Sequence, residues 1–181
     1  MTIKQKQCLL CYLGYYSGAI DGIWGKQSDS ATRKFQQVQG LEENGIFDAT
    51  LEKKILEVIG KDDWWQEIRW FDRKEFACKC GKYCDGYPSE MRREAIAIAD
   101  SARSHFGKPA TVVSGLRCQT HNANVGGVAN SQHMYGEAVD LRIQGVSAGE
   151  LLLFLQAQPG VRYAYAINDT NVHFDIAKGT R

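Results

Sequence analysis

Two short stretches of this chain carry residues that could bind a metal ion. His133 and Asp140 stand seven residues apart, and Gly136 between them permits a tight turn. His173 lies near the C-terminus, where polar and apolar residues alternate. Two imidazoles and a carboxylate can serve as the three protein ligands of a catalytic zinc ion, which leaves a further position for water. The set predicts a hydrolytic metal centre, because zinc lowers the pKa of bound water to about 7.

Strand periodicity explains how residues so distant in the chain could meet. Apolar residues alternate with polar ones over residues 138–143 and again over residues 171–176. If the apolar side chains face a core, then Asp140, His173 and Asp175 face the other side of one sheet. His133 precedes its strand in a loop, so two strands and a loop can bring three ligands to one ion.

The surrounding sequence predicts an α+β unit over residues 71–181. An apolar stripe from Met91 to Ala102 has helical spacing. The run from Ser147 to Glu150 has the form of a capping box and predicts the start of a second helix. Four short alternating segments predict strands, which gives a small, mainly antiparallel sheet.

Residues 1–60 predict a separate unit of three helices. Gly40 is placed to end the second helix, and Asp48 is placed to cap the third. Residues 61–70 are charged and contain two adjacent tryptophans, which indicates a linker that packs partly against the next domain. The chain therefore divides into a helical domain, a linker and a catalytic domain.

The composition is that of an ordinary globular protein. The chain of 181 residues is 44% hydrophobic and 24% charged, with a net charge of +1, so nothing suggests a nucleic-acid partner. No apolar run approaches the ~20 residues of a membrane helix, and we expect a monomer without a membrane partner. The polar N-terminus lacks the pattern of a signal peptide, which predicts synthesis in the cytoplasm.

Six cysteines require an explanation. Cys8 and Cys11 have helical spacing and are expected in a core. One or two disulfides, a structural metal site or free buried thiols all remain open for the rest, with reduced thiols expected in the absence of an export signal. These remaining cysteines are Cys78, Cys80, Cys84 and Cys118.

The glycine and aromatic residues of the first unit form an ordered set: Gly14-Tyr15-Tyr16, Asp21-Gly22-Ile23-Trp24-Gly25, Phe35-Gln36 and Asn44-Gly45. This set resembles the peptidoglycan-binding-like domain of bacterial and phage wall hydrolases. The resemblance implies that bacterial peptidoglycan is the partner of residues 1–60.

The second unit carries Ser131-x-His133-x-x-Gly136-x-Ala138-x-Asp140 and then Val172-His173-x-Asp175. These motifs resemble the zinc D-alanyl-D-alanine carboxypeptidase family, which shares its fold with lysostaphin-type enzymes and the hedgehog signalling domain. The resemblance implies that His133, Asp140 and His173 bind Zn²⁺. It also implies that Ser131 and Arg117 hold a substrate carboxylate or stabilise an oxyanion. A guanidinium group suits that task because it binds carboxylate with two parallel hydrogen bonds.

The general base departs from the family pattern. Many relatives have a glutamate three residues before the last histidine ligand, where this chain has Thr170, and some have a histidine where this chain has Asn171. The nearby carboxylates are Asp175 and Asp169. Asp175 is favoured because it shares a strand face with His173.

These observations predict a zinc peptidase that cuts a D-amino-acid-containing bond in the stem or cross-link of peptidoglycan. The order of the domains and the missing signal peptide favour a phage or prophage endolysin, which reaches the wall after holin-type release from the cytoplasm. The alternative is a catalytically inactive zinc-containing protein that binds the wall. A cytosolic dipeptidase is a weaker alternative, because a soluble substrate needs no anchor. The motifs leave open which bond is cut.

Overall fold

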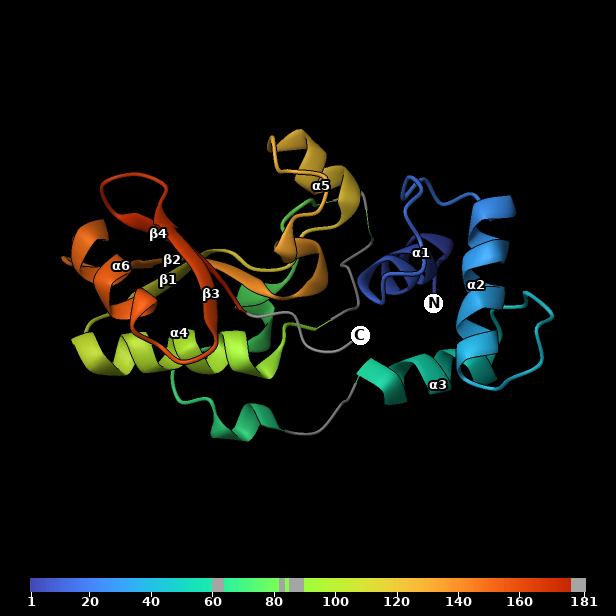
Figure 1. Ribbon diagram of the computed structural model, residues 1–181, viewed down its shortest axis with the longest axis horizontal. Coiled ribbons are helices and arrows are strands. Elements are labelled where there is room, and N and C mark those ends of the chain that lie inside the picture. Colours follow the sequence, from blue (N-terminus) through green and yellow to red (C-terminus); the bar gives the residue numbers. More distant parts are fainter. Residues whose placement is uncertain (60–63, 82–83, 85–89, 177–181) are drawn as a thin grey trace.

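The structure is a computed structural model that describes residues 1–59, 64–81, 84 and 90–176. The chain forms two units that lie side by side, one of helices alone and one built on a sheet (Figure 1). This arrangement confirms the predicted α+β class. Within the residues that the structure describes, no helix is long and apolar enough to cross a membrane.

The N-terminal unit contains three helices. They are α1 (Ile3–Tyr12), α2 (Lys26–Val38) and α3 (Ala49–Ile59). The predicted cap of α3 is confirmed, since Asp48 Oδ1 accepts a hydrogen bond from the Leu51 backbone N–H at 2.8 Å. Apolar residues from all three helices are fully buried, among them Leu9, Phe35 and Ile55.

The second unit is built on a four-stranded sheet. Its strands are β1 (Ala110–Ser114), β2 (Ala138–Ile143), β3 (Val161–Ala166) and β4 (Asn171–Ile176). Their order is β1-β2-β4-β3, and each neighbouring pair is antiparallel, as predicted. The two central strands, β2 and β4, are the ones that carry the candidate ligands.

Helices α4 (Arg93–Phe106) and α6 (Ala148–Gln156) pack against the sheet and against each other (Figure 1). The predicted capping box is present, because Ser147 accepts from the Glu150 backbone N–H and the Glu150 side chain accepts from Ser147. Among the described residues, four shorter helices lie in the connections between the larger elements. They are η1 (Trp64–Glu67), η2 (Arg73–Phe76), α5 (Gln119–Asn124) and η3 (Gln132–Tyr135).

The register of β2 and β4 aligns the polar residues. Asp140 is paired with His173, and the next polar residue of β4, Asp175, is paired with Ala138. Val139 and Phe174, also paired, are completely buried. The expectation that three polar residues share the face opposite the core is therefore confirmed.

Part of the predicted linker is packed against the second unit, while residues 60–63 lie outside the described residues. The Trp65 ring lies 6.0 Å from that of Phe76, and the Trp70 backbone N–H donates to Asp100 of α4 at 2.9 Å. Helix α1 also packs against η3, so the two units are in direct contact.

Candidate metal centre and its cleft

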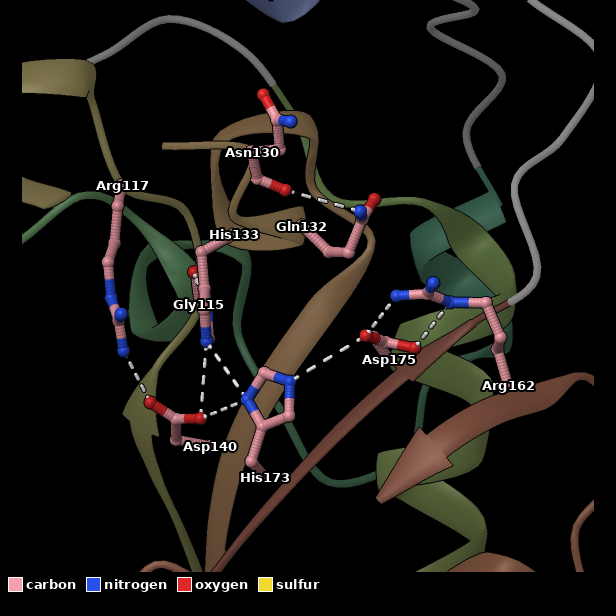
Figure 2. Close-up of polar contacts among 9 residues, drawn as sticks. All are labelled: Gly115, Arg117, Asn130, Gln132, His133, Asp140, Arg162, His173 and Asp175. Atoms are coloured by element: carbon pink, nitrogen blue, oxygen red, sulfur yellow. Dashed lines mark hydrogen bonds and ion pairs between the residues drawn. The ribbon is translucent and has the colours of Figure 1, made fainter. Parts of the chain in front are cut away.

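Three ligand atoms converge where η3, β2 and β4 meet (Figure 2). His133 Nε2 lies 3.2 Å from Asp140 Oδ1, and His173 Nδ1 lies 2.7 Å from the same oxygen. The two histidine nitrogens are 3.3 Å apart. All three side chains are buried. The structure therefore brings together the three residues that the sequence predicted as ligands.

The loop after β1 sets the orientation of the first histidine. His133 Nδ1 lies 2.7 Å from the Gly115 carbonyl oxygen, so this nitrogen carries the proton and donates it. Nε2 is left with its lone pair directed at the other two ligands. Burial lowers the pKa of His133, although Asp140 opposes that shift. The hydrogen bond to Gly115 and the burial of the ring both favour an uncharged imidazole whose Nε2 can bind a cation.

Asp140 is held as a carboxylate. Its burial opposes ionisation, but the close contacts with His133 and His173 and the charge of Arg117 hold its pKa well below the usual range. Arg117 Nη2 donates to Asp140 Oδ2 at 2.5 Å, which leaves Oδ1 facing the two histidines. Arg117 Nε also donates to Ser114 Oγ at 2.8 Å, so two contacts fix the guanidinium.

The three ligands open into a cleft of about 500 Å³. Arg117 and Ser131 both line it, as expected for residues that would contact a substrate. Its remaining walls come from the glycine loop after α5 and from β3. Three candidate ligands beside an accessible cleft have the arrangement expected of a catalytic metal site rather than of a closed structural one.

Asp175 lies beside the other nitrogen of His173 (Figure 2). Its Oδ2 is 3.9 Å from His173 Nε2, while Nδ1 of the same ring faces Asp140. Arg162 binds both oxygens of Asp175, with Nε at 3.0 Å from Oδ1 and Nη2 at 2.6 Å from Oδ2. The carboxylate that was predicted as a base is thus also placed to support a ligand.

The second candidate base lies elsewhere. Asp169 is exposed in the β3–β4 turn, where its backbone oxygen accepts a hydrogen bond from the Ala148 N–H, and it is absent from the described lining of the cleft. Asp140 and Asp175 are the two carboxylates among the described residues that line the cleft. The role of base stays a prediction, and the geometry favours Asp175 over Asp169.

Sequence reasoning missed the contribution of β3. The alternation of Tyr163 and Tyr165 was recognised as a strand pattern, but both side chains are exposed and line the cleft. The Tyr165 ring centre lies 4.9 Å from that of His173. Arg162 was also missed. The available signal in the sequence was the spacing of the two tyrosines, which stand two residues apart in one strand with the small Ala164 between them.

Comparison with known proteins shows the family to which the chain belongs. The model of the peptidase M15 family matches residues 69–175, more than half of the chain. The chain therefore belongs to the peptidase M15 family. Residues 2–55 match the model of a peptidoglycan binding domain. The predicted family and its pairing with an N-terminal peptidoglycan-binding domain are confirmed.

Two curated relatives are similar to parts of the chain. The chain is 34% identical over 129 residues to a zinc D-Ala-D-Ala carboxypeptidase from Streptomyces albus G, an alignment that covers 68% of this chain and 49% of the relative. It is 35% identical over 60 residues to a spore cortex-lytic enzyme from Oceanobacillus iheyensis, covering 33% of this chain and 22% of that enzyme. The chain thus spans about half or less of the length of each relative.

Proposed function

We propose that this protein is a zinc-dependent peptidase that cuts the peptide part of bacterial peptidoglycan. The observation that carries the proposal is the convergence of His133, Asp140 and His173 at the base of a cleft. The family match, together with the peptidoglycan binding domain and the two relatives that it resembles, supports the choice of substrate.

The residues present fit a zinc ion. Two imidazole nitrogens and one carboxylate oxygen face a common point, and each side chain has a further contact outside the group. A bound zinc ion would supply a Lewis acid that polarises a carbonyl and acidifies water.

The remaining polar groups of the cleft suit a peptide substrate. Arg117 presents a partly buried positive charge that can hold a substrate carboxylate or stabilise negative charge on the carbonyl oxygen. Ser131 lies beside it on the loop that begins η3 and can donate a hydrogen bond to the same group. Asp175 is proposed to take a proton from the attacking water, for which one of its oxygens must leave Arg162.

The N-terminal unit carries a pocket suited to the wall. It has a volume of about 300 Å³ and is lined by polar, aromatic and basic residues of α2 and the loop before it, including Tyr15, Lys26 and Lys34. Lysines can bind the carboxylates of the wall peptides, and a tyrosine ring can pack against a sugar face. We propose that this pocket holds the enzyme on peptidoglycan, and that the protein acts as a phage or prophage endolysin.

One observation favours the inactive alternative. The carboxylate of the cleft that is not in the ligand group, Asp175, is bound through both oxygens by Arg162. While both oxygens are bound by Arg162, neither is free to accept a proton from the attacking water. If Asp175 never leaves Arg162, the protein would bind the wall without cutting it.

Digestion of purified peptidoglycan tests the proposal and names the bond. The wild-type chain should release peptide fragments that mass spectrometry identifies, and both a chelator and the His133→Ala substitution should abolish them. A His105→Ala variant, changed at an exposed histidine stacked on Phe154, should match the wild type. Absence of new termini from walls of several cross-link types, with zinc bound at the ligand group, would support the binding protein instead.

A further inference from the structure

A second group of metal-binding side chains lies outside the cleft. Three of its cysteines stand close together in the chain and the fourth comes from the loop that carries Arg117. Their sulfur atoms all lie within 4.8 Å of one another, and none is in a disulfide. The four are Cys78, Cys80, Cys84 and Cys118.

The spacing of these sulfurs suits one tetrahedral ion. Zinc bonds sulfur at about 2.3 Å, so four sulfurs around it lie about 3.8 Å apart. The observed limit of 4.8 Å, with Cys80 and Cys84 at 3.2 Å, needs small side-chain shifts to reach that geometry. Four soft sulfur ligands favour zinc over the harder cations.

Backbone hydrogen bonds prepare two of the sulfurs to be ligands. The Cys118 N–H donates to Cys78 Sγ at 3.3 Å, and the His121 N–H donates to Cys118 Sγ at 3.4 Å. Hydrogen bonds of this kind stabilise negative charge on sulfur and orient it, which is the role of groups around metal-binding thiolates. A disulfide sulfur carries no charge and gains little from them.

The cluster joins three parts of the molecule. Cys78 and Cys80 follow η2, and Cys118 caps α5 directly after Arg117. The fully buried Cys84 interacts with the Cys8 thiol of α1, in the N-terminal unit. An ion at this point would fix the Arg117 loop to η2 and support the contact with α1.

We propose that these four cysteines form a structural zinc site, so that each chain holds a second zinc ion in addition to the one at the histidines. The site is closed, because four protein ligands leave no position for water or substrate. Binding the ion releases the protons of those thiols that are not already ionised and leaves all four as thiolates. The cysteines then remain reduced because zinc protects them.

Metal analysis of the purified full chain tests this proposal without any activity assay. The wild type should contain two zinc ions per chain, and a His133→Ala/His173→Ala variant should retain one. An organomercurial that captures thiolates should release that last zinc ion, whereas a weak chelator should not. Replacement of the retained ion by cobalt should give the charge-transfer absorption of thiolate ligands.

Cysteine variants supply the matched comparison. Cys118→Ser should lose one zinc ion, and Cys11→Ala, which removes a buried thiol outside the cluster, should lose none. If Cys118→Ser does not fold, the double histidine variant still decides the question. The proposal would be overturned if the His133→Ala/His173→Ala variant contains no zinc, or if it contains iron in place of zinc. It would also be overturned if only two free thiols are found after denaturation without reductant.

Discussion

His173 uses both of its ring nitrogens. Nδ1 faces Asp140 and His133, while Nε2 faces Asp175 at 3.9 Å. The His133 ring is also fixed from outside the ligand group, because its Nδ1 donates to the Gly115 carbonyl oxygen. Each imidazole is therefore oriented by one partner and presents its other nitrogen to the metal position, which is how protein metal sites select a tautomer.

The role of Asp175 can be separated from simple support of His173. At saturating zinc, Asp175→Asn should lower turnover by about 10²–10⁴-fold and keep the metal, because a missing general base costs that much. Arg162→Ala should keep turnover within about tenfold, since it frees the same carboxylate. Measurements of kcat and of zinc content over a zinc titration check both variants.

A different outcome would show that Asp175 supports His173 instead of acting as the base. If excess zinc restores the turnover of Asp175→Asn, then the residue acts on the ligand His173, where loss of a supporting carboxylate costs about 10–100-fold in metal affinity. The base would then have to come from another group.

The sequence predicted the three candidate ligands but not the role of Arg162. The alternation of β3 puts Arg162 on the face opposite Tyr163. The register shifts between Val161 and Tyr163, so Arg162 is an extra residue in the strand, and its side chain reaches Asp175. Neither the bulge nor the resulting ion pair has a signature in the sequence.

At the scale of elements, the turn between η3 and β2 controls the distance between two ligands. Gly136 ends η3 with a φ of +69°, which side chains other than glycine rarely adopt. An added Cβ would lie 2.6 Å from the Glu90 carbonyl oxygen and 2.9 Å from Met91 Cα. This is a close approach of backbone to backbone, and it cannot be relieved by moving a flexible side chain.

Gly136→Ala should therefore destabilise the protein by about 2–4 kcal/mol, the sum of the left-handed backbone cost and the steric overlap. Gly107→Ala is the control, because Gly107 also has a positive φ of +60° but would place its Cβ in open space. It should cost only about 1–2 kcal/mol. Denaturant unfolding compares the two, and equal losses would show that the contact with Glu90 and Met91 is unimportant.

Elements with a local signal were well predicted from the sequence. The capping box at Ser147, the cap at Asp48 and the alternation around Asp140 each depend on residues within one segment. The pairing of Asp140 with His173 depends on which strands become neighbours, and alternation alone allows that outcome without requiring it. The cysteine cluster was left open for the same reason, because Cys118 joins it only through the fold.

At the scale of the whole molecule, the two units share an interface next to the site. Tyr12 of α1 is 2% exposed, and its ring lies 3.2 Å from the position that a Gly136 Cβ would take. The Arg92 guanidinium lies 4.9 Å from the centre of the same ring, and Gln119 Nε2 donates to the Ser17 carbonyl at 2.8 Å. The N-terminal unit thus contributes to the stability of the region that holds the ligands.

Tyr12→Ala should lower the free energy of unfolding by about 3–5 kcal/mol, because it removes a large buried ring. Tyr12→Phe keeps the ring and should change the free energy of unfolding by about 1 kcal/mol or less. Hydrogen exchange should show faster exchange around Gly136 in the alanine variant alone. Unchanged exchange there would mean that α1 stabilises only its own unit.

Wall binding should be separable from cleavage. Lys26→Glu/Lys34→Glu should weaken co-sedimentation with insoluble peptidoglycan by at least about tenfold, since each lysine loses a charge-assisted contact. Cleavage of soluble wall peptides should not change. Lys53→Glu/Lys74→Glu makes the same change in charge at two exposed positions away from the pocket and is the control. Equal losses of wall binding in both double variants would show that the change in net charge explains the effect.

The most direct measurement of the central claim is an anomalous-scattering map of the zinc-loaded crystal, recorded at the zinc absorption edge. We expect a peak between His133 Nε2, Asp140 Oδ1 and His173 Nδ1, open to the cleft. Soaking with a chelator should remove this peak and, in solution, a chelator should also abolish peptidoglycan cleavage. Cleavage that persists in zinc-free protein, or full zinc loading with no peak at these three residues, would contradict a catalytic zinc ion at this position.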